Sequence, residues 1–112
     1  MIYKNHIDAY FYAEKGDINL IEKYFDADVV IDDTGEGEVI RGIEESKKWL
    51  KDKIKKYNLQ REIIDIKEDK KTVNVSTKVT GDFAKGVFLF EYIFIFSNDK
   101  IKKIKIVFVG EE

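Results

Sequence analysis

The sequence predicts an α+β fold, with helices in its first half and an antiparallel sheet in its second half. Apolar residues recur at helical spacing from Tyr3 to Tyr57, and beyond that point they alternate with polar residues as in half-buried strands. The 112 residues leave room for one compact domain. Hydrophobic residues make up 44% of the chain, enough to offset the entropy lost on folding. We therefore expect residues 1–112 to form a single ordered domain.

Two short helices are expected at the start of the chain. The apolar stripe of the first helix is Tyr3, Ile7, Tyr10 and Phe11, and that of the second is Ile18, Ile21, Tyr24 and Phe25. Gly16 between them suits the left-handed conformation that commonly ends a helix. Asp17 has the short acceptor side chain that begins the next helix.

The middle of the chain predicts a short pair of strands and a third helix. Residues 29–31 are β-branched and lead into an acidic loop with glycines at residues 32–38. Gly42 precedes a helix that reaches Tyr57, with acids at its start and lysines toward its end. That charge order suits the helix dipole.

Residues 58–112 predict four strands in an antiparallel meander. Turn residues separate the strands at residues 69–71, 81–86 and 97–100. The strand at residues 87–96 is apolar on both alternating sets, which indicates a central strand with both faces covered.

The two sets of this central strand need different partners. The helices can cover one set within the monomer: Phe88, Phe90, Tyr92, Phe94 and Phe96. The other set has no such cover and would form an apolar patch with neighbouring valines: Val87, Leu89, Ile93 and Ile95, beside Val75, Val79, Val107 or Val109. We therefore expect a homodimer through the outer face of the sheet.

Composition argues against several classes of function. The chain has no cysteine, which excludes a disulfide, a thiolate nucleophile and a Cys-type metal site. A net charge of −2 argues against a nucleic-acid partner. The apolar runs are shorter than the ~18 residues of a membrane span, and nothing resembles a signal peptide. His6 is the only histidine, so we expect no metal and no cofactor. These observations predict a soluble, cytoplasmic protein without a membrane partner.

The order of these elements resembles the nuclear-transport-factor-2-like superfamily, in particular its SnoaL-like and ketosteroid-isomerase-like branch. The following residues carry the resemblance: Tyr10-Phe11, Gly16-Asp17, residues 25–29, Ile31-Asp32-Asp33, Gly42, and Phe94-Ile95-Phe96 with residues 101–106. The resemblance implies a cone in which three N-terminal helices pack on a strongly curved, mostly antiparallel sheet. It also implies an interior pocket for a hydrophobic small molecule, and frequently a dimer through the sheet. Members of the superfamily include isomerases, polyketide cyclases, epoxide hydrolases, dehydratases and non-catalytic binding modules, so the fold leaves the activity open.

The resemblance places Asp33 where the ketosteroid isomerases have their proton-transferring carboxylate. Apolar surroundings would raise the pKa of such a group toward the working range. The alternative is that Asp32 and Asp33 are solvated acids of the acidic loop. Two further isomerase positions do not match, because Ala9 stands in place of a tyrosine and Tyr92 in place of an acid. Steroid isomerisation is therefore not expected.

Five aromatic residues are candidates for binding the ligand: Tyr10, Trp49, Phe90, Tyr92 and Phe94. Each can equally belong to the hydrophobic core, and Trp49 can either pack on the sheet or form a wall of the pocket. The sequence thus predicts a small-molecule-binding protein, an isomerase, cyclase or hydrolase with Asp33 as acid or base. The alternative is a non-catalytic ligand-binding or dimerisation module of the same fold.

Overall fold

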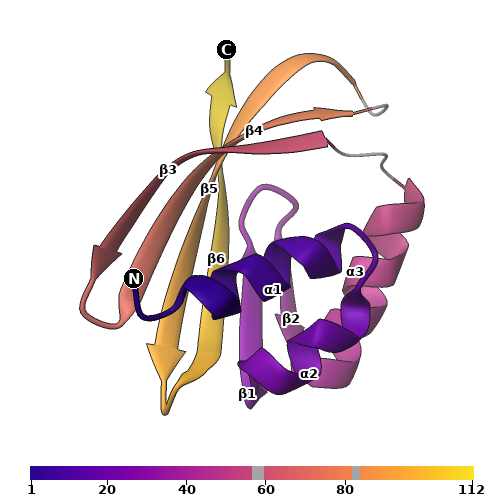
Figure 1. Ribbon diagram of the computed structural model, residues 1–112. Coiled ribbons are helices and arrows are strands. Elements are labelled where there is room, and N and C mark those ends of the chain that lie inside the picture. Colours follow the sequence, from indigo (N-terminus) through magenta and orange to yellow (C-terminus); the bar gives the residue numbers. More distant parts are fainter. Residues whose placement is uncertain (57–59, 82–83) are drawn as a thin grey trace.

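The computed structural model, which describes residues 1–56, 60–81 and 84–112, places helices on one side of a six-stranded sheet (Figure 1). The helices are α1 (Lys4–Glu14), α2 (Ile21–Tyr24), which continues a 3-10 turn at Ile18–Leu20, and α3 (Ile43–Lys56). The strands are β1 (Phe25–Asp33), β2 (Glu38–Arg41), β3 (Gln60–Asp69), β4 (Thr72–Gly81), β5 (Ala84–Ser97) and β6 (Lys100–Glu111). The predicted α+β fold with three N-terminal helices is confirmed.

The strand order is β2-β1-β6-β5-β4-β3. Strands β3 to β6 form the predicted antiparallel meander, while β1 runs parallel to β6 and antiparallel to β2. Strand β1 begins at Phe25, earlier than the expected Val29, because Phe25 pairs with Ile101 before a register shift. The expected helix residue Tyr57 and the expected turn residue Asp82 lie outside the described residues.

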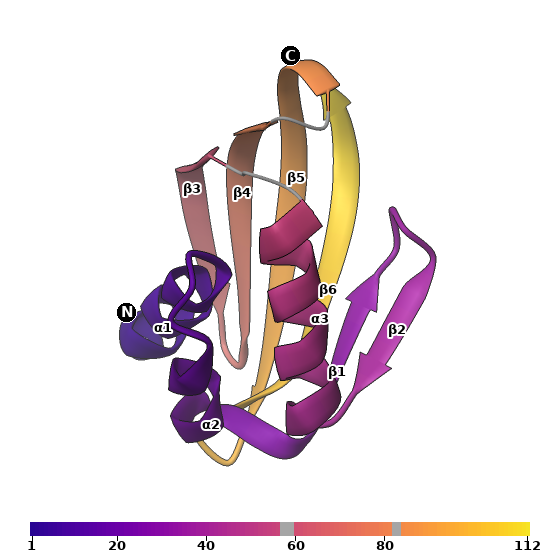
Figure 2. The same cartoon turned by 90° about the vertical axis from the view of Figure 1, so that its right-hand side faces the viewer.

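The helices cover the concave face of the curved sheet (Figure 2). Their apolar stripes meet the inward side chains of β1, β4, β5 and β6 in one core. Its members include Ile7, Tyr10, Val29, Ile31, Leu50, Val73, Tyr92, Phe94 and Ile104, all fully or almost fully buried. This burial is what the helical spacing of the first half and the strand alternation of the second half predict.

Two glycines shape the path between these elements. Gly16 has a φ of +128° at the end of α1, as predicted, but the side chain of Asp17 makes no capping hydrogen bond. Gly42 has a φ of +86°, a conformation that costs other residues backbone strain. Its N–H donates to the Val29 carbonyl at 2.8 Å, and its carbonyl accepts from the Ser46 backbone at 3.1 Å. Gly42 therefore ties the start of α3 to β1 and sets the helix over the sheet.

The register between β4 and β5 corrects one expectation about the outer face of the sheet. Val75 lies opposite Tyr92 and Val79 opposite Phe88, so both valines point toward the helices and are buried. Alternation by itself does not say which set of a strand faces inward, and directly opposed residues share a face. The outer neighbours of the central strand are instead Asn74, Ser76 and Lys78 on β4, and Lys105 and Val107 on β6.

Candidate functional site

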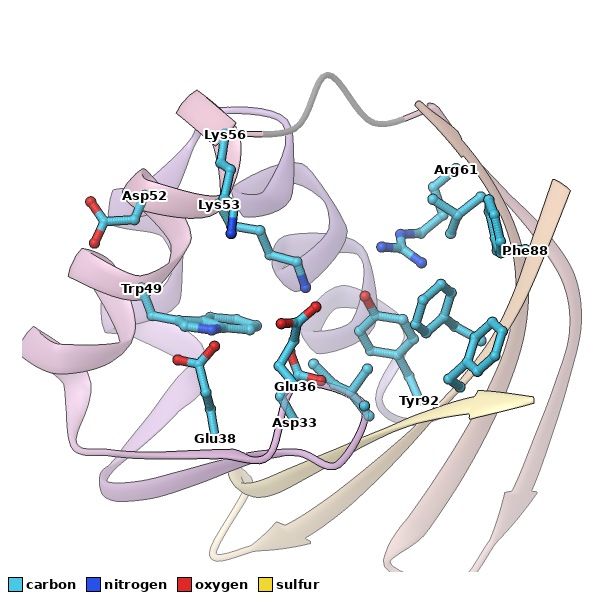
Figure 3. Close-up of a pocket in the computed structure, with 15 residues that line it drawn as sticks. Asp33, Glu36, Glu38, Trp49, Asp52, Lys53, Lys56, Arg61, Phe88 and Tyr92 are labelled. Carbon is cyan, nitrogen blue, oxygen red and sulfur yellow. The ribbon is translucent and has the colours of Figure 1, made fainter. Parts of the chain in front are cut away.

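A cavity of about 450 Å³ opens between α3, the β1–β2 loop and strands β3 to β6 (Figure 3). Apolar side chains of the sheet form one wall: Val79, Phe88, Phe90, Tyr92, Ile106 and Phe108. The remaining lining is mostly charged and comes from α3, the end of β1, the β1–β2 loop and the start of β2, with Arg61 entering from β3. These residues are Trp49, Asp52, Lys53, Lys56, Asp33, Gly35, Glu36 and Glu38. This volume falls within the range of small-molecule sites.

Asp33 ends β1 on the floor of the cavity, and the residue is only 4% exposed. The alternation of β1 explains its orientation, because Val29, Ile31 and Asp33 all face the helices. Burial raises the pKa of Asp33, and the nearby carboxylates of Glu36 and Glu38 act in the same direction. The charge of Lys53 and a hydrogen bond from the backbone of Glu36 oppose this rise only in part. Asp33 is therefore a buried acid rather than a solvated loop residue.

A buried ion pair that the sequence did not predict lies beside the apolar wall. Arg61 Nε donates to Glu14 Oε1 at 2.8 Å, and the two side chains are 9% and 8% exposed. The hydroxyl groups of Tyr10 and Tyr92 both donate to Glu14 Oε2 at 2.8 Å. Arg61 also donates to Thr77 Oγ1 at 3.0 Å, and its guanidinium lies 4.7 Å from the centre of the Tyr92 ring. Four elements, α1, β3, β4 and β5, thus meet in one polar network.

The network holds its members in defined charge states. Burial favours a neutral Glu14, but the charges of Arg61 and Lys53 and the two tyrosine hydrogen bonds lower its pKa overall. Burial and the adjacent Glu14 raise the pKa of Tyr10 and Tyr92. Burial alone would lower the pKa of Arg61, but the surrounding acidic groups raise it. Tyr92 therefore presents its ring to the cavity, while its hydroxyl group stays protonated and donates a hydrogen bond to Glu14.

The aromatic residues that the sequence proposes as ligand contacts lie in two places. Trp49, Phe90 and Tyr92 line the cavity. Tyr10 and Phe94 are fully buried in the core behind it. The centre of the Tyr10 ring lies 5.6 Å from that of Tyr92 and 5.5 Å from that of Phe94. Contact of these five residues with a ligand remains a prediction.

Sequence reasoning missed Glu14, Lys53 and Arg61. Glu14 carried a signal, since it follows Ile7 and Tyr10 at helical spacing on the buried stripe of α1. A charge at such a position calls for a buried partner. Lys53 and Arg61 carried none, because Lys53 is one of several lysines on α3 and Arg61 lies between the polar residues Gln60 and Glu62.

The described residues contain no group of three or more histidine or acidic side chains placed to hold a metal ion. His6 lies among the rings of Tyr3, Tyr24 and Phe96, and its Nε2 lies 2.8 Å from the Asp99 carbonyl. In the same described part of the chain, no helix is both long and apolar enough to cross a membrane.

Comparison with solved structures finds many close matches to this fold. A candidate polyketide cyclase from Sinorhizobium meliloti matches with a TM-score of 0.83 and 23% identity, over 91% of this chain and 93% of that chain. A hypothetical protein with a ketosteroid-isomerase-like fold from Catenulispora acidiphila, in complex with trimethylamine, matches with a TM-score of 0.80 and 16% identity, over 91% and 83% of the two chains. An LEH-like epoxide hydrolase from M. tuberculosis matches with a TM-score of 0.76 and 17% identity, over 93% and 80%.

Comparison of the sequence itself finds no matching family model and no matching curated protein. The structural matches also include NTF2-like and SnoaL-like proteins. Since their identities are low, the likeness concerns the fold, and activity has to be argued from the site. The chain has the nuclear-transport-factor-2-like fold, in the form shared by SnoaL-like and ketosteroid-isomerase-like proteins.

Proposed function

We propose that the chain binds a hydrophobic small molecule in the cavity and that Asp33 acts on it as a general acid or base. The reaction class is that of an isomerase, cyclase or hydrolase. The observation that carries this proposal is the burial of the Asp33 carboxyl group on the floor of the cavity, beside its apolar wall. A carboxyl group whose pKa is raised by its surroundings in a cleft is a frequent mark of an active site.

The shape and lining of the cavity support this function. The apolar body of a ligand can lie against Phe88, Phe90 and Phe108, which removes its surface from water. Its reacting atoms then face Asp33, which exchanges a proton more readily near neutral pH because its pKa is raised. Among proteins of this fold, the one from S. meliloti is a candidate polyketide cyclase and the one from C. acidiphila is in complex with trimethylamine, which supports a small-molecule ligand for this chain.

A non-catalytic binding module is the second candidate, and one observation favours it. The hydroxyl group of Tyr92 and the Nε of Arg61 both bind Glu14, so these two donors are not directed at a ligand. A pocket whose polar wall groups satisfy one another can bind an apolar molecule without reacting with it.

Binding can be measured through Trp49, the only tryptophan, which lines the cavity. We expect 4-nitroanisole, an apolar aromatic quencher, to reduce its fluorescence in a saturable way. Phe108→Ala removes an exposed part of the cavity wall and is expected to weaken this binding several-fold. Val39→Ala, an equally accessible apolar residue of β2 outside the cavity lining, is the matched control. Quenching that does not saturate, or that Phe108→Ala leaves unchanged, would contradict a ligand-binding cavity.

Catalysis by Asp33 can be tested without knowledge of the natural substrate. A general base accelerates the exchange of acidic C–H protons, and 2-tetralone in D₂O reports this exchange by proton NMR. We expect the wild-type protein to accelerate exchange, Asp33→Asn to abolish the acceleration, and Asp32→Asn on the neighbouring position to retain it. Equal rates for wild type and Asp33→Asn, with 4-nitroanisole binding intact, would favour the non-catalytic module.

We also propose that two copies pair through the outer face of the sheet. Val87, Leu89, Ile93 and Ile95 lie on the face of β5 opposite to the buried Tyr92 and Phe94, and none of the helices in the described part of the chain covers that face (Figure 1). Glu91 lies in the middle of this set, and Lys78 and Lys105 lie on the adjoining strands of the same face. A two-fold axis near Glu91 would pair each acid with a lysine of the other copy while hiding both apolar sets.

Sedimentation equilibrium at micromolar concentration tests this assembly. We expect twice the monomer mass of 13.1 kDa for the wild type and the monomer mass for Ile93→Asp. Val39→Asp adds the same charge at an exposed position of β2 and is expected to leave the dimer intact. A monomeric wild type would show that the outer face is not a dimer interface.

A further inference from the structure

Lys53 reaches from α3 into the middle of the cavity, toward the side chains of Asp33 and Glu36 (Figure 3). Its Nζ lies 4.5 Å from the centre of the Trp49 ring, so the indole face holds the ammonium in place. Among the described residues, no carboxylate oxygen lies within 4.0 Å of Lys53 Nζ, the distance at which two charged groups form an ion pair. The ammonium is thus positioned by a ring and has no anion in direct contact.

Across the cavity, the charge of Arg61 is already paired with a carboxylate, and the hydroxyl group of Tyr92 already donates its one hydrogen bond. Arg61 donates to Glu14 and Thr77, and Tyr92 donates to Glu14. A ligand oxygen that enters the cavity therefore finds in Lys53 a charged donor whose hydrogen bonds are available. Such a donor stabilises an oxyanion more strongly than it stabilises a neutral oxygen, because a charge-assisted hydrogen bond is the stronger one.

The other charged groups around Lys53 restrict the type of anion. Those that face the cavity or act on it are Asp33 on β1, Glu36 in the loop, Glu38 on β2, Asp52 and Lys56 on α3, Arg61 on β3, and Glu14 behind Tyr92. Arg61 offsets the charge of Glu14, and the carboxylate of Asp52 points away from the centre of the cavity (Figure 3). Glu36 and Glu38 are exposed, so water and salt screen their charges.

Three ligand classes can be compared on this basis. A cationic ligand is disfavoured, because cations of the protein already occupy the faces of two aromatic rings of the cavity. Lys53 lies over the ring of Trp49, and Arg61 lies over the ring of Tyr92. A carboxylate would enter with a permanent charge next to Asp33. An acidic hydroxyl group enters neutral, can give its proton to the Asp33 carboxylate, and then presents an oxyanion to Lys53. Of the three classes, only an acidic hydroxyl group uses both the ammonium group of Lys53 and the carboxyl group of Asp33.

Building on the proposed function, we propose that the natural ligand carries an acidic hydroxyl group, a phenol or an enol, on its apolar body, and that Lys53 binds the oxygen as the oxyanion. In this step the ligand O–H bond breaks, its electron pair stays on the oxygen, and the proton forms an O–H bond with Asp33. Lys53 is then the residue that determines which ligands the cavity prefers.

The test uses three compounds with one nitrophenyl body: 4-nitrophenol, its methyl ether 4-nitroanisole, and 4-nitrobenzoate. The absorbance of 4-nitrophenol reports whether the bound molecule is the phenol or the phenolate. We expect bound 4-nitrophenol to ionise about one pH unit or more below the free compound, as an adjacent cation does to an acid. Lys53→Met keeps the aliphatic stem and is expected to remove this shift, while Lys53→Arg keeps the charge and retains it. Lys51→Met, on an exposed position of the same helix outside the cavity lining, is expected to behave as wild type.

The outcomes separate this inference from the proposed function. If 4-nitroanisole binds but bound 4-nitrophenol ionises at the same pH as the free compound, or equally in wild type and Lys53→Met, the role of Lys53 is refuted while the pocket stands. Tighter, Lys53-dependent binding of 4-nitrobenzoate than of 4-nitrophenol would assign the site to carboxylates and refute the hydroxyl class. If none of the three compounds binds, the proposed function falls together with this inference.

Discussion

Replacing Glu14 by Gln tests the buried network that forms part of the cavity wall. The substitution keeps the shape of the side chain but removes the charge that lies 2.8 Å from Arg61 Nε. The guanidinium then stays buried without a counter-ion, and breaking a buried pair in this way costs about 3 to 5 kcal/mol. Arg61 also borders the cavity, where water can reach it, so we expect a loss near 3 kcal/mol. A typical domain is stable by only about 5 to 15 kcal/mol.

Urea unfolding followed by Trp49 fluorescence measures this loss, and a double-mutant cycle assigns it to the pair. Arg61→Met is expected to be destabilising as well, because it leaves the Glu14 carboxylate buried and unpaired. The double variant Glu14→Gln/Arg61→Met should lose less free energy of unfolding than the sum of the two single variants, since neither charge is then buried alone. A loss below about 1 kcal/mol for Glu14→Gln, or strictly additive losses, would refute the reasoning, because an exposed pair behaves in that way.

Three further predictions concern stability. The pKa of Glu14 is lowered in the folded state, so the unfolded chain binds more protons at acid pH. The stability that Glu14 contributes should therefore be lost as the pH falls below 4.5, the ordinary pKa of a glutamate, and acid titration of Glu14→Gln should lack this loss. The pKa of Asp33 is raised above 3.8, so its contribution is lost as the pH rises through the folded value, and Asp33→Asn should gain about 0.5 to 2 kcal/mol at pH 7 in urea unfolding but not at pH 3. Leu50→Ala empties a fully buried position of α3 and should cost about 2 to 5 kcal/mol by thermal or urea unfolding, against less than about 0.5 kcal/mol for the exposed Lys51→Ala.

Most elements of the fold could be predicted because their signals are local. Helical spacing identified the stripes of α1 and α3, and strict alternation identified β4. Gly16 and Gly42 adopt positive φ at the helix ends where their lack of a Cβ is useful. Element ends were less accurate, as the early start of β1 at Phe25 shows, because that residue is held in the sheet by a distant pairing with Ile101.

The candidate site could also be predicted only in part from the sequence. Asp33 was identified through the resemblance, and its burial follows from the alternation of β1. Trp49, Phe90 and Tyr92 were selected as aromatic residues on faces that could line a pocket. The same criteria also selected Tyr10 and Phe94, which lie in the core behind the cavity. Aromatic character alone does not separate a cavity wall from the core, because both positions are largely hidden from water.

By itself, the sequence determined the fold class, the helix stripes, the meander and the apolar character of both faces of β5. Only the tertiary structure decided which charges meet. Glu14 and Arg61 are 47 positions apart in the chain, and the outward or inward orientation of Val75 and Val79 depends on the register between β4 and β5. Periodicity is a property of neighbouring residues, whereas a buried ion pair forms only where packing brings two distant side chains within about 4 Å and excludes water. In a chain with 20 basic and 22 acidic residues, many pairings are compatible with the sequence, and the packing of α1 and α3 against the sheet selects among them.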